Sequence, residues 1–148
     1  MNENTIAAFL SMEINVETLA SVVRNSEHKL DLITTAVTVS EMKSEFVITR
    51  TMALRLCDAV LNETLQAEVL RTVAFVIVSS DHLTWGDDDL LGDILCDWSC
   101  PEVNYPLTPE NMVRCRKWLD GIESYPPKGG SIGLDRGTLI SRLIRKHE

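Results

Sequence analysis

Residues 65–78, LQAEVLRTVAFVIV, decide how this chain folds. Leu65, Val69, Val73, Val76 and Ile77 recur at helical spacing, and the end of the stretch is apolar on nearly every side. A helix that is apolar all round is usually buried on most of its surface. The sequence therefore predicts a helix here, at the centre of the core.

A second helix is expected immediately before the first. It should begin near Ser40 and run for roughly four to five turns, until Asn62 and Glu63 interrupt the pattern. One face of it is marked by regularly spaced apolar residues: Phe46, Ala53, Leu54, Cys57 and Leu61. The two helices together predict an antiparallel helical hairpin.

Two more helices are expected after the central one. Residues 90–98 carry an amphipathic pattern that ends in Trp98, and three aspartates fall in or before its first turn, where carboxylates complement the helix dipole. Prolines in residues 100–108 exclude a continuous helix there. Thr108 followed by Pro109 then matches a helix start, and Gly121 matches its end.

The remaining segments give weaker patterns. Short helices are predicted over residues 5–10 and 16–23, capped by Asn4 or Thr5 and by Asn15. Residues 30–39 are rich in the Thr and Val of strands, but their apolar residues hold helical spacing, which favours a helix. Residues 125–133 predict a loop, and residues 139–146 a last helix.

These elements predict an all-α fold, in which residues 1–148 form a single helical domain. A helical bundle is the first expectation, and short stacked helical hairpins are the alternative. The length and the 45% share of hydrophobic residues suffice for one core. The sequence shows neither a signal peptide nor an apolar run long enough for a membrane span, so a cytoplasmic protein with reduced cysteines is expected.

The charge is concentrated in residues 81–110, which contain eight acidic residues and no lysine or arginine. Residues 111–148, in contrast, carry a net charge of +4. The net charge of −8 disfavours direct binding to nucleic acid. Because aromatic residues are interleaved with the acids, the stretch has the composition of a recognition surface for a basic partner, although a solvated face without a function has similar composition.

The candidate partner-binding residues are the acids and aromatic anchors of this stretch. Trp98 shares the helical phase of Leu91 and Ile94 and is expected in the core, whereas Trp85 and Tyr105 fall outside that phase. The predicted binding set comprises Trp85, Asp87, Asp88, Asp89, Asp93, Asp97, Glu102 and Tyr105.

Metal binding and catalysis have little support in the sequence. Asp87, Asp89 and Asp93 do not fit a calcium loop, because the twelfth position counted from Asp87 is Trp98 rather than Glu. The spacing of Cys96 and Cys100 is wider than the CxxC pair of strong zinc motifs. No cysteine or histidine lies in a recognisable catalytic signature. We therefore expect no catalytic residue, no metal and no cofactor, and a small metal-dependent enzyme remains the third alternative.

Residues 97–111, DWSCPEVNYPLTPEN, followed by Trp118 and Leu119, resemble a segment of small bacterial immunity proteins from toxin–immunity pairs, including contact-dependent growth inhibition systems. The resemblance implies a protein that binds one cognate toxin domain, commonly a nuclease, and blocks it. Such immunity proteins are commonly acidic. The first functional hypothesis is therefore an immunity protein with a basic toxin domain as its partner, and the second is a helical scaffold or adaptor that forms homo-oligomers.

Overall fold

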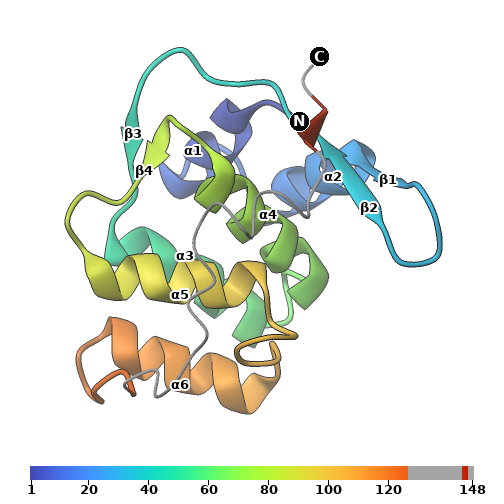
Figure 1. Cartoon of the computed structure of the whole chain (residues 1–148). Coiled ribbons are helices and arrows are strands. Elements are labelled where there is room, and N and C mark those ends of the chain that lie inside the picture. Colours follow the sequence, from blue (N-terminus) through green and yellow to red (C-terminus); the bar gives the residue numbers. More distant parts are fainter. Residues whose placement is uncertain (127–144, 147–148) are drawn as a thin grey trace.

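The computed structural model describes residues 1–126 and 145–146, and this part of the chain contains six α-helices and five short β-strands (Figure 1). The helices are α1 (Glu3–Leu10), α2 (Val16–Ser26), α3 (Arg50–Leu61), α4 (Ala67–Ser79), α5 (Asp89–Ser99) and α6 (Pro109–Leu119). The strands are β1 (Glu27–Lys29), β2 (Thr35–Thr38), β3 (Phe46–Val47), β4 (Leu83–Thr84) and β5 (Arg145–Lys146). The prediction of a mainly helical protein is confirmed, but the prediction that it is all-α is wrong.

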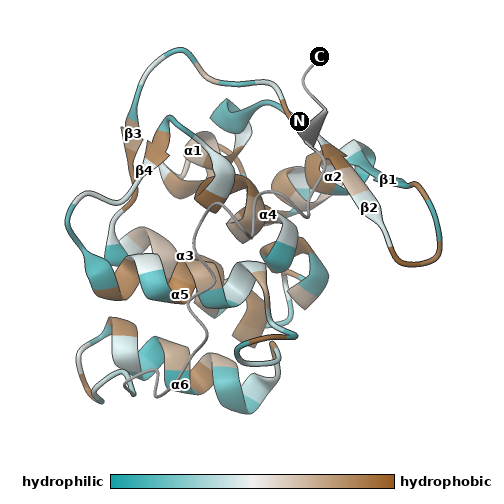
Figure 2. Cartoon of the chain, viewed as in Figure 1, coloured by the Kyte–Doolittle hydropathy of each residue, from teal (hydrophilic) through white to brown (hydrophobic). Residues whose placement is uncertain are grey.

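Helix α4 is the centre of the core, as its apolar sequence predicts. Leu70, Val73, Val76 and Ile77 are each 0% exposed, and the buried apolar residues of the described chain form one cluster around them. Figure 2 shows how apolar residues line the inward sides of the surrounding helices. The expected hairpin of α3 and α4 is only part of the packing, because α4 packs most extensively against α5, and α3 against α6.

The strands form two small sheets. Strand β2 pairs antiparallel with β1 and parallel with β5, in the order β1-β2-β5, and β3 pairs parallel with β4. The β1–β2 hairpin projects from the helical body in Figure 1. Because β3 and β4 are separated by two helices, their pairing fixes the position of the chain just before α5.

The prediction of a helix over residues 30–39 is wrong. The Asp31 side chain accepts hydrogen bonds from the backbone N–H groups of Ile33 at 2.8 Å and Thr34 at 2.7 Å, which makes a turn instead of a helix. The β-branched residues after the turn then form β2. The helical spacing of Leu30, Ile33 and Val37 is misleading, because only Val37 of the three is buried.

The start of α3 also differs from its prediction. The helix begins at Arg50 rather than near Ser40, and the Thr49 side chain accepts a hydrogen bond from the backbone N–H of Met52 as its N-cap. Phe46, predicted on the helix face, lies in β3 opposite Leu83 of β4. A strand pair that closes over such a long separation leaves no local signal in the sequence.

The predicted helix caps are mostly confirmed. Asn15 caps α2 and Thr108 caps α6, with Pro109 at the first helical position, while Gly121 takes the left-handed φ of +73° just after α6 ends. Helix α1 begins at Glu3 and is capped by Asn2, not by Asn4 or Thr5 as predicted.

The predicted loop over residues 125–133 and the last helix over residues 139–146 lie mostly outside the described residues, which resume only at Arg145. Arg145–Lys146 form strand β5, so the predicted helix does not include them. Within the described chain, none of the helices is both long and apolar enough to cross a bilayer.

Candidate functional site: the acidic end of helix α5

Three aspartates at the start of α5 are exposed, as predicted. Asp87 precedes the helix, Asp89 begins it and Asp93 lies one turn further on the same side, with side chains about 5–6 Å apart at their Cβ atoms for residues at that spacing. In the described chain, no lysine or arginine forms a salt bridge with any of them. We call these three residues the acidic end of α5.

Asp88, which lies between Asp87 and Asp89, has a structural role instead. Its Oδ2 accepts a hydrogen bond from Arg50 Nε at 2.7 Å and its Oδ1 accepts one from Arg50 Nη2 at 2.9 Å, so that the two groups form a bidentate pair. Asp88 also accepts the backbone N–H of Leu91 as the N-cap of α5. The hydrogen bonds from Arg50 hold the pKa of this carboxyl below its ordinary value. Asp88 therefore joins α3 to α5, and its charge is neutralised.

Trp85 lies against the first turns of α5. A Cβ atom added at Gly92 would lie 2.5 Å from Trp85 Nε1, so the indole passes directly over this glycine, where any side chain would displace it. The ring is half-buried and packs against the core cluster. Strand β4 ends one residue earlier, which places Trp85 beside the acidic end. The predicted anchor and the three exposed carboxylates are thus brought together.

Asp97 is not part of this surface, contrary to prediction. The residue is 1% exposed and its Oδ2 accepts a hydrogen bond from the Tyr125 hydroxyl at 2.5 Å. Burial, the hydrogen bond to Asp97 and the nearby Asp93 charge raise the pKa of Tyr125 above its ordinary value. Asp97 follows Ile94 by three residues, so its helical phase already pointed towards the core.

Glu102 and Tyr105 lie beyond the other end of α5, about 16 Å of helix away. Glu102 is exposed and pairs with Arg71 of α4 at 2.5 Å. Tyr105 packs against the buried Trp118, with ring centroids 5.7 Å apart, and Tyr125 meets the same indole edge-on at 5.0 Å. The predicted binding set is therefore divided between the two ends of the helix. Among the described residues, Asp87, Asp89 and Asp93 at the first end form no salt bridge, whereas Glu102 at the other end pairs with Arg71.

The alternative metal sites are not assembled in the described structure, where no three His, Cys, Asp or Glu side chains form a group that would hold an ion. Cys96 of α5 and Cys100, which follows that helix, are half-buried, and Cys115 is buried in α6. Burial raises the pKa of Cys115 to about 11, so its thiol is protonated at neutral pH.

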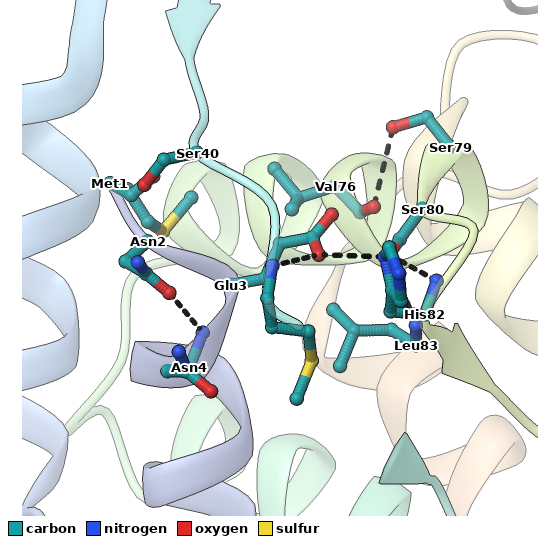
Figure 3. Close-up of polar contacts among 11 residues, drawn as sticks. Met1, Asn2, Glu3, Asn4, Ser40, Val76, Ser79, Ser80, His82 and Leu83 are labelled. Atoms are coloured by element: carbon teal, nitrogen blue, oxygen red, sulfur yellow. Dashed lines mark hydrogen bonds and ion pairs between the residues drawn. The ribbon is translucent and has the colours of Figure 1, made fainter. Parts of the chain in front are cut away.

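Sequence reasoning did not indicate that the buried Glu3 lies beside the half-buried His82 (Figure 3). Glu3 is 0% exposed, its Oε2 accepts the backbone N–H of Met42 at 3.0 Å, and His82 Nδ1 lies 3.9 Å from the same oxygen. The Met1 ammonium donates to Thr38 O at 2.7 Å nearby. These contacts connect α1 with the segment after β2 and with the residue before β4. Neither residue of the pair lines the cavity between the β1–β2 hairpin, α4 and the end of α5, or the one between α3, α4 and α6.

Comparisons of the chain with protein-family models, curated proteins and solved structures give no match.

Proposed function

We propose that this chain is an immunity protein, which binds a basic toxin domain through the acidic end of α5 and blocks its active site. The observation that supports this proposal is the set of exposed carboxylates of Asp87, Asp89 and Asp93, which stand beside Trp85 without a salt bridge to any described cation. A nuclease is the toxin class that fits best, because its cleft is lined by lysine and arginine for a phosphate backbone.

Several other acidic residues are paired with cations, unlike these three aspartates. Asp58 and Asp120 both pair with Arg116, and Glu123 pairs with Lys117. Paired surface charges cancel at a distance. Asp87, Asp89 and Asp93 lie within seven residues and form no salt bridge in the described chain, so they produce a local negative potential. Such a potential accelerates the encounter with a basic partner and makes its rate depend on salt.

Trp85 supplies the second component of a binding surface. Aromatic anchors surrounded by polar groups carry much of the binding energy at protein interfaces. The close contact with Gly92 holds the indole in one orientation before binding, so that less side-chain entropy is lost when the partner binds. The carboxylates would govern the association rate, and burial of the indole the dissociation rate.

The experiment compares capture by three forms of the immobilised protein: wild type, the D87N/D89N/D93N variant, and an E13Q/E17Q/E110Q control with the same charge change at exposed sites elsewhere. Lysate of the native bacterium is passed over each at low and moderate salt. A basic protein retained by the wild type and the control, but lost by the Asn variant, is the expected result.

The captured protein is then expressed alone and together with this chain. Growth arrest by the captured protein, relieved by the wild type and not by the Asn variant, would support an immunity function. A captured protein that is harmless when expressed alone would refute it, as would equal capture by all three forms.

A further inference from the structure

A cavity of about 430 Å³ opens between the β1–β2 hairpin, α4 and the end of α5. Its volume falls within the range of roughly 300–1,000 Å³ that is typical of ligand pockets. Helix α4 contributes Glu68, Arg71, Thr72 and Phe75, the hairpin contributes one wall, and Cys100 follows α5 at the far side. The cavity lies at the opposite end of α5 from the acidic end, so it is a separate site.

The polar lining of the cavity is negative. The Thr72 hydroxyl donates to Glu27 Oε1 at 2.5 Å, and Glu68 lies one turn before Thr72 on the same side of α4. Neither Glu27 nor Glu68 pairs with a cation of the described chain. Among the described lining residues, Arg71 is the one cation, and it is already paired with Glu102. The carboxylates of Glu27 and Glu68 therefore outnumber the guanidinium in this part of the lining.

The rest of the lining is apolar and continues onto an exposed surface. Phe75 and Val37 line the cavity. Ile33 lines it as well, although its side chain is 95% exposed. Ile33, Leu32 at 104% and Leu30 at 51% exposure form the apolar tip of the hairpin, which stands away from the body in Figure 2. Three large aliphatic side chains together in water are typical of an interaction surface.

We propose that the cavity receives an arginine side chain of a protein partner, whose adjoining apolar residues pack on the hairpin tip. An arginine stem is aliphatic and matches Phe75 and Val37, while the guanidinium presents a planar fork of donors to Glu27 and Glu68. The proposal depends on the proposed function only for the identity of the protein that carries the arginine: the same basic partner would be held at both ends of α5.

The test uses N-acetylarginine amide as the probe and N-acetylcitrulline amide as its neutral control of almost the same shape. Each is titrated into the full-length ¹⁵N-labelled protein at low salt, and the amide shifts are followed by NMR. The arginine probe should move the amides of Thr34, Thr35, Thr72 and Cys100 in a saturable way, with a Kd on the order of 1 mM for so small a ligand. The citrulline probe should not.

Two variants locate the binding. E27Q/E68Q keeps an acceptor for Thr72 but removes both charges, and it should weaken binding roughly five-fold or more. Where this variant does not fold, E68Q alone at an exposed side chain provides the same test with a smaller effect. The D87N/D89N/D93N variant should bind the probe as the wild type does, because its substitutions lie at the other end of α5.

The proposal would be overturned if these amides did not shift, or if they shifted equally with the neutral probe. It would also be overturned if the amides of residues 30–35 shifted with protein concentration in the absence of a probe, because a second copy of the chain would then be the occupant. The assay needs no toxin. Its failure is therefore distinguishable from failure of the proposed function, which is judged by growth arrest and rescue.

Discussion

Replacing Tyr125 by Phe should destabilise the protein by about 1–2 kcal/mol. The substitution removes one hydroxyl, which donates to the buried Asp97 carboxylate at 2.5 Å, and leaves the ring in place against Trp118. A hydrogen bond to a charged group is worth about 1.5–3 kcal/mol. We expect the lower part of this range, because Tyr125 is half-buried and water can reach the edge of the ring.

Tyr105→Phe is the matched control. Tyr105 is also half-buried and also packs against Trp118, at 5.7 Å between centroids, but no hydrogen bond of its hydroxyl is found in the described chain. Its loss should change the free energy of unfolding by less than about 0.5 kcal/mol. Urea unfolding followed by tryptophan fluorescence measures both variants. Equal effects of the two substitutions would contradict the assignment of Asp97 to the core.

The same pair gives a pH dependence with a definite sign. Because the pKa of Tyr125 is raised in the folded state, the folded protein keeps this proton at a pH where the unfolded chain, with a tyrosine pKa of about 10, has lost it. The wild type should therefore lose stability relative to Tyr125→Phe as the pH rises above about 10. A constant difference between the two from pH 8 to 11 would contradict the raised pKa.

Three further predictions follow from the packing of other side chains. Gly92→Ala should displace the Trp85 indole and shift its fluorescence to the red. The net loss of stability should be about 0–2 kcal/mol, because overpacking costs about 1–3 kcal/mol and the higher helix propensity of alanine contributes about 1 kcal/mol. Unchanged emission would contradict the close contact. Glu3→Ala should cost about 1–3 kcal/mol in urea unfolding, because it leaves a buried backbone N–H without its acceptor, and a cost below about 0.5 would contradict this. Burial raises the pKa of Cys57 to about 12 and of Cys115 to about 11. The unfolded chain therefore loses these protons at a lower pH than the folded protein, and the wild type should lose stability relative to C57A/C115A as the pH rises from about 8.5 to 11. A constant difference in the free energy of unfolding over this range would contradict the raised pKa values.

The helical part of the fold was predictable because its signals are local. The apolar run of α4, the Asn15 cap of α2 and the Thr108–Pro109 start of α6 each depend on residues within one or two turns. The parallel pairing of Phe46 with Leu83 depends on two segments that meet only after α3 and α4 have packed, so no window of sequence contains it.

The hairpin was missed for a different reason. Asp31 lies just before residues rich in Thr and Val, and an aspartate that accepts the N–H groups two and three residues later is a turn signal. The helical spacing of Leu30 and Ile33 predicts a buried face, but both side chains are exposed. Spacing alone cannot distinguish a core face from an apolar surface.

The candidate site was predictable in composition but not in its boundaries. Asp87, Asp89 and Asp93 lie on the surface as expected, and Trp85 lies beside them. Asp88 and Asp97 are acids of the same stretch, but their partners Arg50 and Tyr125 lie about 40 and 30 residues away in sequence. Those partners decide which carboxylates of the described chain have no salt bridge, and they become apparent only in three dimensions.

The most direct test of the account is the salt dependence of the association rate between this protein and its captured partner, measured by stopped flow for the wild type and D87N/D89N/D93N. If Asp87, Asp89 and Asp93 attract the partner, the variant should associate roughly ten-fold more slowly at low salt. Its salt dependence should be flatter, and its dissociation rate and stability should be unchanged. Association kinetics identical to those of the wild type at every salt concentration would contradict this prediction.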